Sequence, residues 1–149
     1  MNRLVIILSA ALLVSCEVTV DDNPEVEWLQ APGTEDLNLP FSSAVRVDNL
    51  LFLSGQVGYD KEAGALVEGG IQAETRQTLE NISQTLEDFG SSMDRVVKCT
   101  VFLADMSEWG AMNEVYVTFF PNKPARSALG ASGLALNART EIECIAVVD

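Results

Sequence analysis

The sequence predicts an α+β domain in which two helices cover one face of a mixed sheet. Apolar residues and threonines recur every three or four positions from Ile71 to Phe89, the spacing of an amphipathic helix. They are Ile71, Thr75, Thr78, Leu79, Ile82, Leu86 and Phe89. A second stripe of this kind follows Asp105, and runs of strand length lie around the two stripes. Each helix is apolar on one side only. Both are therefore expected on the same side of the sheet, which leaves the other sheet face uncovered in a single chain.

The expected element order is three strands, a helix, a strand, a second helix and two strands. Asp48-Asn49 separates two strand-like runs and is a hairpin signal. Residues 59–70 are rich in turn formers and indicate a loop, and Gly90 ends the first helix. Asp105 with Glu108 resembles a capping box for the second helix. The apolar stripe of that helix is expected in the core: Trp109, Met112, Tyr116 and Phe119. The expected strands are 26–29, 44–47, 50–53, 96–103, 125–131 and 141–148.

The first residues have the pattern of a targeting segment. A positive start at Arg3 precedes an apolar run from Leu4 to Val14 that is too short for an ordinary transmembrane helix. The run ends in Leu-Val-Ser-Cys, which resembles a bacterial lipobox. We expect residues 1–15 to be a signal peptide and Cys16 to be the lipidated first residue of an exported, membrane-anchored lipoprotein, periplasmic or on the cell surface. An ordinary signal peptide or a buried strand are the alternatives.

Residues 16–38 form an acidic segment that we interpret as a tether, and residues 39–149 are expected to form one domain. Residues 26–29 are a candidate for the first strand of that domain. Two further cysteines lie in strand-like runs, at Cys99 and Cys144. Buried free thiols are the interpretation that the sequence favours for this pair. A disulfide is the alternative in an oxidising compartment, but sequence does not supply its geometry.

Composition excludes several kinds of site. The chain contains no histidine, which removes Ser-His-Asp and Cys-His nucleophile systems and most zinc and iron sites. Acid–base chemistry then falls to carboxylates, Lys, Tyr, Cys or bound water. The net charge of −13 and a sequence pI near 4.2 disfavour binding to nucleic acid.

Arg126 is the most informative charged residue. It is followed by a stretch without charge from Ser127 to Ala138. A guanidinium in an apolar neighbourhood is costly unless an anion meets it. That anion is either one of the glutamates of the last strand, Glu141 or Glu143, or the carboxylate of a ligand held by the planar fork of the side chain.

Several segments follow one another in a characteristic order and spacing between residues 26 and 149. They are Leu39-Pro40-Phe41-Ser42, Leu53-Ser54-Gly55-Gln56, the helix 73–86, the segments 97–105 and 113–120, Pro124-Ala125-Arg126-Ser127 and Glu141-Ile142-Glu143. Together they resemble the RidA/YjgF group of reactive-intermediate (enamine/imine) deaminases. The resemblance implies a chorismate-mutase-like fold assembled as a homotrimer whose sheets form a central barrel, with ligand clefts between neighbouring subunits.

The resemblance also implies a reaction and the residues that perform it. The arginine matching Arg126 holds the substrate carboxylate, and the acid matching Glu141 positions water for hydrolysis of a 2-imino acid to a 2-keto acid and ammonia. Ser54 and Asn113 match positions that line the cleft. No metal or other cofactor is implied, because the C=N carbon is already electrophilic.

Two positions depart from the common pattern of the group. Phe41 stands where many members have tyrosine, and Ala128 stands where many have cysteine, so a hydroxyl contact and a thiol are missing while an aromatic wall and a backbone donor stay. Glu143 lies on the same strand face as Glu141 and is a secondary candidate for its role. Lys98 has no assigned role.

Two other functions compete with the deaminase. A lipid-anchored trimer could bind a small carboxylate, or a protein partner, without turnover, because binding needs only the arginine. A ribonuclease activity, sometimes attached to relatives, is disfavoured by the acidic composition.

Overall fold

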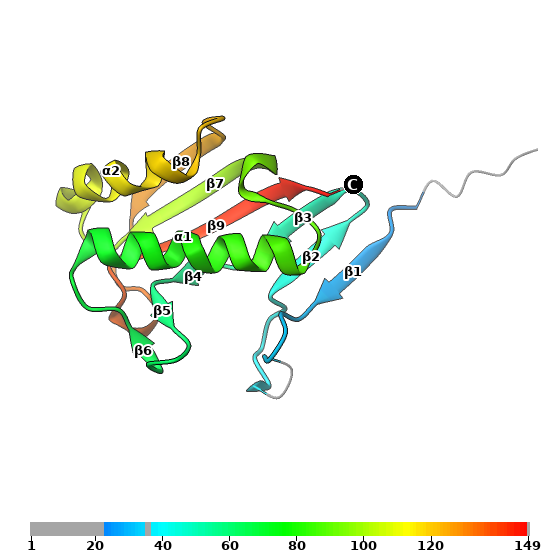
Figure 1. The fold of residues 1–149 in the computed structure, drawn as a ribbon, viewed down its shortest axis with the longest axis horizontal. Coiled ribbons are helices and arrows are strands. Elements are labelled where there is room, and N and C mark those ends of the chain that lie inside the picture. Colours follow the sequence, from blue (N-terminus) through cyan, green and yellow to red (C-terminus); the bar gives the residue numbers. More distant parts are fainter. Residues whose placement is uncertain (1–22, 35–36, 149) are drawn as a thin grey trace, which may run out of the picture.

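The computed structural model describes residues 23–34 and 37–148 and has the predicted α+β architecture (Figure 1). The helices are α1 (Ile71–Asp88) and α2 (Trp109–Phe119), with single 3-10 turns at Met93–Arg95, Met106–Glu108 and Ala135–Asn137. The strands are β1 (Val26–Leu29), β2 (Ala44–Val47), β3 (Leu50–Leu53), β4 (Gln56–Val57), β5 (Tyr59–Asp60), β6 (Ala65–Leu66), β7 (Val96–Leu103), β8 (Ala125–Gly130) and β9 (Thr140–Val147). The predicted signal peptide, Cys16 and the first part of the acidic segment lie outside the described residues.

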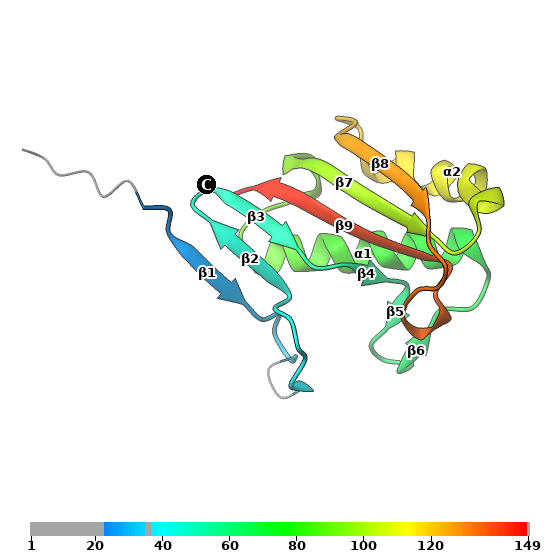
Figure 2. The ribbon, with the colours of Figure 1, turned by 180° about the vertical axis from the view of Figure 1, so that it is seen from behind.

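One mixed sheet carries the fold. Its strand order is β1-β2-β3-β9-β7-β8, and β4 continues the β3 side of β9 beyond the end of β3 (Figure 2). All pairs in this sheet are antiparallel except β7 with β8, which are parallel and connected through α2. Strand β8 is therefore a free edge of the sheet within the chain.

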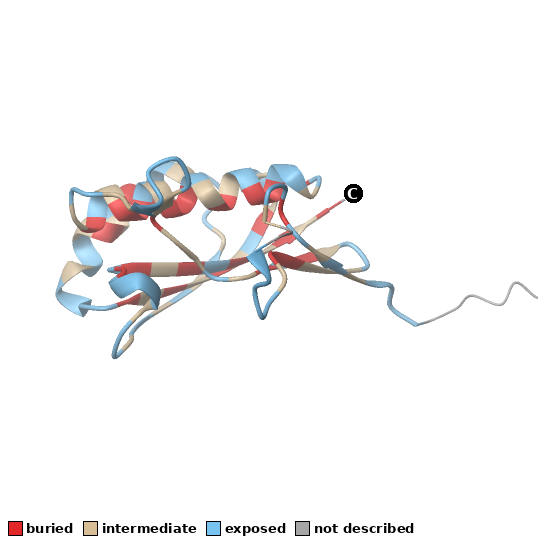
Figure 3. Ribbon diagram, turned by 90° about the horizontal axis from the view of Figure 1, so that it is seen from below, coloured by how far each residue is buried: buried red, intermediate tan, exposed pale blue. Residues whose placement is uncertain are grey.

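Both helices pack on one face of the sheet, as the sequence predicts (Figure 3). The core between the layers contains Leu79, Ile82 and Leu86 of α1 and alternate residues of β7 and β9 such as Val101 and Ile142, all fully buried. Helix α1 ends where Gly90 takes a positive φ of 79° and the Ser91 N–H bonds back to the Leu86 carbonyl. This is the left-handed stop that glycine makes without a steric cost.

The opposite sheet face has no covering layer within the described chain (Figure 3). Cross-strand registers place Trp28, Val45, Phe52 and Ile145 in one row on that face. Trp28 is 70% exposed and Phe52 39% exposed, although both are large apolar side chains. A contiguous apolar surface of this kind is characteristic of a protein–protein contact.

Three details differ from the sequence-based prediction. The stretch 59–70 is not all loop, because β5 and β6 form a short hairpin there, and β4 precedes it. The capping box is half formed: the Asp105 carboxylate accepts the Ser107 N–H, whereas Glu108 pairs with Arg139. That hydrogen bond to Ser107 holds the pKa of Asp105 below its ordinary value. Within the described residues no helix is both long and apolar enough to span a bilayer.

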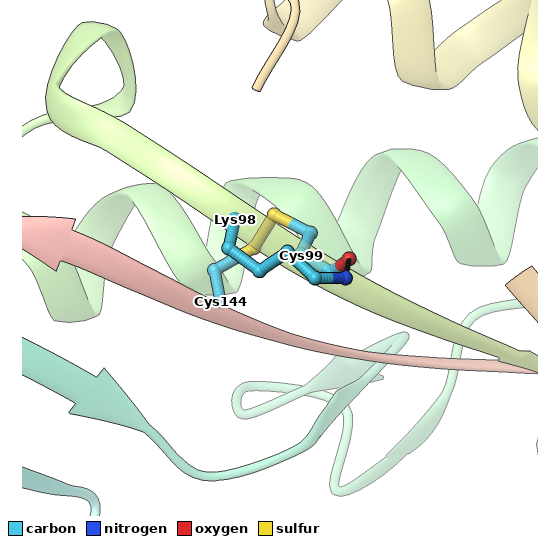
Figure 4. The surroundings of a disulfide bond; sticks show 3 residues. All are labelled: Lys98, Cys99 and Cys144. Carbon is cyan, nitrogen blue, oxygen red and sulfur yellow. Dashed lines mark hydrogen bonds between the residues drawn. A yellow bond between two sulfur atoms is a disulfide. The ribbon is translucent and has the colours of Figure 1, made fainter. Parts of the chain in front are cut away.

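The prediction of free thiols at Cys99 and Cys144 is wrong. The two residues lie directly opposite each other on β7 and β9, and their sulfurs form a disulfide (Figure 4). Directly opposed residues on antiparallel strands come close enough to be bridged, and the Cα–Cα distance here is 4.1 Å. Both cysteines are buried beneath the helices, with exposed fractions of 0% and 2%.

Candidate active site

Arg126 lies on the edge strand β8 and on the helix-covered face of the sheet. Its register partner on β7 is the buried Cys99. The side chain therefore turns towards α2, where Nη1 donates a hydrogen bond to Asn113 Oδ1 at 2.8 Å. The guanidinium carbon also lies 4.5 Å from the ring centroid of Tyr116 and 5.7 Å from that of Trp109. Edge strand and helix together hold the guanidinium between an amide and two aromatic rings.

The charge of Arg126 is not neutralised by a carboxylate of the described chain. Its partners there are a neutral amide and two π faces, which attract a cation without cancelling its charge. A guanidinium has five N–H donors in a planar fork, so donors remain for a carboxylate ligand. The sequence left two kinds of partner open for Arg126: a glutamate of the last strand or the carboxylate of a ligand. Within one chain, the structure excludes the glutamates Glu141 and Glu143 as partners.

Tyr116 forms the inner wall beside Arg126. Burial raises the pKa of its phenol above the ordinary value of 10.0, and the nearby Arg126 charge offsets part of that rise. The ring packs on Phe120, with centroids 4.6 Å apart. The buried Oη has no hydrogen-bond partner among the described residues, so the ring, and not the hydroxyl, provides the contact with Arg126.

Trp109 corrects the prediction that the whole stripe of α2 lies in the core. Met112 and Tyr116 are buried as expected, but Trp109 is 40% exposed and stands next to the guanidinium. Its helical spacing is the same as that of the core residues, so spacing alone does not predict its exposure. Trp109 is exposed because it is the first residue of α2 and lies at the end of the helix. The sequence analysis therefore did not identify Trp109 as a residue beside the Arg126 guanidinium.

Glu141 lies on the other, uncovered face of the sheet. It belongs to β9 between the buried Thr140 and Ile142 and is half-buried. Its carboxylate rests against Gly55, since a methyl group on Gly55 would overlap Glu141 Oε1. The glycine in Ser54-Gly55-Gln56 therefore makes room for the acid, a role not assigned to it from sequence.

Ser54, the neighbour of Gly55, connects the chain beside Glu141 to the segment that carries Phe41. Ser54 Oγ donates to the Ser42 carbonyl at 2.7 Å, which ties the end of β3 to the segment before β2. Phe41 precedes Ser42 and is 53% exposed. The predicted residues Phe41, Ser54 and Glu141 thus gather at one end of the sheet.

Ala128 belongs to the arginine side of the candidate site. It lies two residues after Arg126 on the same face of β8 and packs against the core. The Ala131 N–H bonds to the Leu103 carbonyl of β7, and backbone groups alternate in direction along a strand. The Ala128 N–H therefore points away from β7, towards the free sheet edge.

The structure thus separates the predicted site residues into two groups. We call Arg126, Asn113 and Ala128 the arginine group, and Phe41, Ser54 and Glu141 the glutamate group. Arg126 of β8 is paired with Cys99 of β7, and Cys99 is paired with Cys144 of β9. Cys144 lies three residues after Glu141 on the same strand. The two groups are offset by about 10 Å across two strands and about 10 Å along them. They also lie on opposite sheet faces, so one chain does not bring them together.

The secondary candidate Glu143 and Lys98, to which the sequence assigns no role, lie elsewhere on the uncovered face. Glu143 is exposed and opposite Thr100, and Lys98 Nζ donates to Ser127 Oγ at 3.1 Å and to the Cys99 carbonyl at 2.9 Å. Both line a hollow of about 130 Å³ over β3, β7 and β9. Among the residues that the structure describes, no group of three acidic or cysteine side chains is arranged to hold a metal ion.

Fold and site together define a class of protein: a small α+β protein with an unneutralised arginine at a sheet edge and an acid on an uncovered apolar sheet face. The family model described as Endoribonuclease L-PSP matches residues 33–148. The chain belongs to this family, which includes the RidA/YjgF proteins that the sequence resembles.

The relatives and solved structures agree with this assignment. The 2-iminobutanoate/2-iminopropanoate deaminase of Mus musculus is 46% identical over 109 residues, covering 72% of this chain and 81% of that protein. The crystal structure of the yeast protein YEO7 superposes with a TM-score of 0.77 at 36% identity, covering 84% of this chain and 100% of that one. E. coli TdcF with bound serine has a TM-score of 0.70 at 30% identity, covering 74% and 90%.

Proposed function

We propose that the protein is a hydrolase that deaminates small reactive 2-imino and enamine acids to 2-keto acids and ammonia. The observation that carries the proposal is the Arg126 guanidinium, which is oriented by Asn113 and two aromatic rings but has no carboxylate partner in the described chain. Relatives more than 40% identical are deaminases of 2-iminobutanoate and 2-iminopropanoate, and the ligand of TdcF, serine, carries the carboxylate that such an arginine would bind.

The proposed reaction needs orientation and one base. Arg126 and the outward Ala128 N–H hold the substrate carboxylate, which fixes the adjacent C=N carbon. Glu141 takes a proton from water as the oxygen bonds to that carbon and the C=N electron pair moves to nitrogen. Glu141 returns this proton to nitrogen, which gives the carbinolamine. The carboxylate then takes the hydroxyl proton and passes it to nitrogen as the C–N bond breaks, so that ammonia leaves and the keto C=O forms. An enamine first becomes the imine by protonation at its carbon.

We propose that the working unit is a homotrimer with sites between subunits. Two observations support this. The sheet face that carries Glu141 is apolar and uncovered in the single chain, and Arg126 stands at the free β8 edge on the other face. Packing the edge of one subunit onto the open face of the next would bring an arginine group to a glutamate group. Burying exposed Trp28 and Phe52 in such a contact would also stabilise the assembly.

The remaining residues of the two groups then shape the pocket. Asn113 holds one edge of the guanidinium, while Phe41 supplies an apolar wall and Ser54 a polar contact beside Glu141. The Trp109 ring, 5.7 Å from the guanidinium carbon, would shield one face of the guanidinium from water. A drier site strengthens the arginine–carboxylate attraction.

We further propose that the chain is exported and anchored through a lipid on Cys16. The apolar run ending in Leu13-Val14-Ser15-Cys16 supports this address, and the Cys99–Cys144 disulfide fits an oxidising compartment. Mass analysis of the N-terminal peptide from membranes tests it: a diacylglyceryl thioether on Cys16 is expected, whereas an intact Met1 peptide in the soluble fraction contradicts it.

The same N-terminal pattern favours a second candidate, a lipid-anchored module that binds small carboxylates without turnover. One experiment decides between the two. Protein lacking residues 1–16 is added to 2-iminopropanoate generated in situ by an amino-acid oxidase, and ammonia release is followed. Acceleration above the protein-free control is expected. No acceleration, together with 2-keto acid binding by calorimetry, establishes the binder. A nuclease role is disfavoured by the net charge of −13.

A further inference from the structure

Glu74 of α1 is a buried carboxylate that holds the chain next to the proposed catalytic acid. It is 6% exposed, and its Oε2 accepts the backbone N–H of Arg139 at 2.8 Å. Its Oε1 lies 3.7 Å from Arg139 Nε. On its other side the Arg139 carbonyl accepts the N–H of Ala104. Both backbone groups of Arg139 are therefore fixed, two residues before Glu141.

Asn81 makes a second connection from the same helix. It follows Glu74 by seven residues, which is two helical turns, so both side chains leave α1 on the same side. Its Nδ2 donates to the carbonyls of Val57 at 3.0 Å and Tyr59 at 2.9 Å. Asn81 thereby holds β4, whose Val57 is the register partner of Glu141.

The two connections meet at Glu141. Glu74 fixes the chain before β9, and Asn81 fixes the short strand paired with its first residues, while Figure 1 shows α1 lying across β4 and β9. Gly58 packs directly on the Glu74 backbone, where an added methyl group would come within 2.8 Å of Glu74 Cα. Without α1, the two-residue strand β4 would have little to hold it, because strands this short are marginal.

We propose that Glu74 and Asn81 are positioning residues that fix the Glu141 carboxylate for water activation. The inference rests on the proposed function, and it concerns kcat and not substrate affinity, because among the described residues the hydrogen bonds and ion pairs of Glu74 and Asn81 do not include Arg126, Asn113 or Ala128. A carboxylate base displaced by about 1 Å loses much of its effect, up to about 100-fold in rate.

Glu74 acts by its reach and not by its charge. The bond to the Arg139 N–H needs an oxygen acceptor at the right distance, which glutamine supplies and aspartate, one methylene shorter, does not. The charge is less important, since the Arg139 guanidinium has a second carboxylate partner in Glu108 and its side chain is 49% exposed. Two conservative variants therefore distinguish the effect of side-chain length at position 74 from the effect of its charge: Glu74→Asp changes the length and Glu74→Gln removes the charge.

The test compares Glu74→Asp with Glu74→Gln in the imine assay, with Glu108→Gln as matched control. We expect kcat to fall about 10-fold in Glu74→Asp and to stay within about twofold in the other two. KM, and the Kd for a 2-keto acid measured by calorimetry, should remain within about twofold in all three. Asn81→Ser, which removes the amide donor, should lower kcat in the same way, and it carries the test if Glu74→Asp does not fold.

Other results overturn the inference. Equal losses of kcat and keto-acid binding would show a general structural role, and a loss in Glu74→Gln but not in Glu74→Asp would show that charge is what matters. Unchanged kcat in Glu74→Asp and Asn81→Ser also refutes positioning. All of these require an active wild-type protein, so an inactive wild type refutes the proposed function instead.

Discussion

Two arginines of this chain, Arg126 and Arg139, have opposite surroundings. Arg139 is bound by two carboxylates, Glu74 and Glu108, and its backbone N–H is bonded as well. Arg126 has a neutral amide and two aromatic rings. Arg126 lies within one segment of the family resemblance and Arg139 lies two residues before another, yet only Arg126 keeps its charge available.

We propose that this difference distinguishes a structural arginine, Arg139, from a ligand-binding one, Arg126. A cation paired with two protein acids has little free energy to gain from a further anion, whereas a cation held by rings and an amide still attracts one. The amide and the rings restrict the guanidinium without competing with a carboxylate. The surroundings of an arginine, and not its presence in a motif, thus indicate its role.

The largest expected effect tests this comparison directly. Arg126→Ala should lower kcat/KM for imine hydrolysis about 10²–10⁴-fold, because two charge-assisted hydrogen bonds to the substrate are lost, at about 1.5–3 kcal/mol each. Arg139→Ala should keep 2-keto acid binding, measured by calorimetry, within a few-fold. Equal loss of binding in both variants would break the comparison.

The second prediction distinguishes the two glutamates of β9. Glu141→Gln should reduce kcat about 10²–10⁴-fold, the usual contribution of a general base, while keto-acid binding is retained. Glu143→Gln changes an exposed residue on the same strand face and should leave kcat within a few-fold. Steady-state ammonia release measures both. The opposite ranking would transfer the role of base to Glu143.

The third prediction concerns the disulfide between the central strands β7 and β9, which lie next to β8 and include Glu141, respectively. Reduction of the Cys99–Cys144 disulfide, which closes a loop with a sequence separation of 45, should lower the free energy of unfolding by about 2–4 kcal/mol. Urea unfolding with and without dithiothreitol measures it, and a Cys99→Ala/Cys144→Ala variant should show no effect of the reductant. Two titratable thiols in native, air-oxidised protein would contradict the bond.

The smallest effect is expected for Tyr116→Phe. The ring beside Arg126 stays and the lost Oη has no partner in the described chain, so stability at pH 7 should change by less than about 1 kcal/mol. Burial raises the pKa of Tyr116, so the wild type should lose stability as the pH rises above 10.0, and the variant should lose less. Chemical unfolding at both pH values measures this, and a clear loss at pH 7 would reveal a partner for the hydroxyl.

Much of the fold was predictable because its signals are local. The helical stripe from Ile71 to Phe89, the glycine stop and the hairpin at Asp48-Asn49 each depend on neighbouring residues. The disulfide was not predictable, because it depends on the register of two strands whose cysteines are 45 residues apart. Nor was the short β5–β6 hairpin, whose strands have two residues each.

For the candidate site, the sequence proposes a set of residues but does not give their arrangement. Arg126 follows from its uncharged flank and the motif, whereas the opposite faces of Arg126 and Glu141 follow only from the parallel β7–β8 and antiparallel β7–β9 registers. Trp109 lies on the same predicted apolar stripe of α2 as the buried Met112, so the sequence pattern did not predict that Trp109 is exposed.

The most direct test of the account is complementation between subunits. Arg126→Ala and Glu141→Gln proteins are each purified, unfolded together and refolded as a mixture, and imine hydrolysis is compared with that of each variant refolded alone. If each site combines an arginine group and a glutamate group from different subunits, random mixing restores about a quarter of the wild-type sites. A mixture no more active than its components, despite verified mixed oligomers, would contradict the shared site.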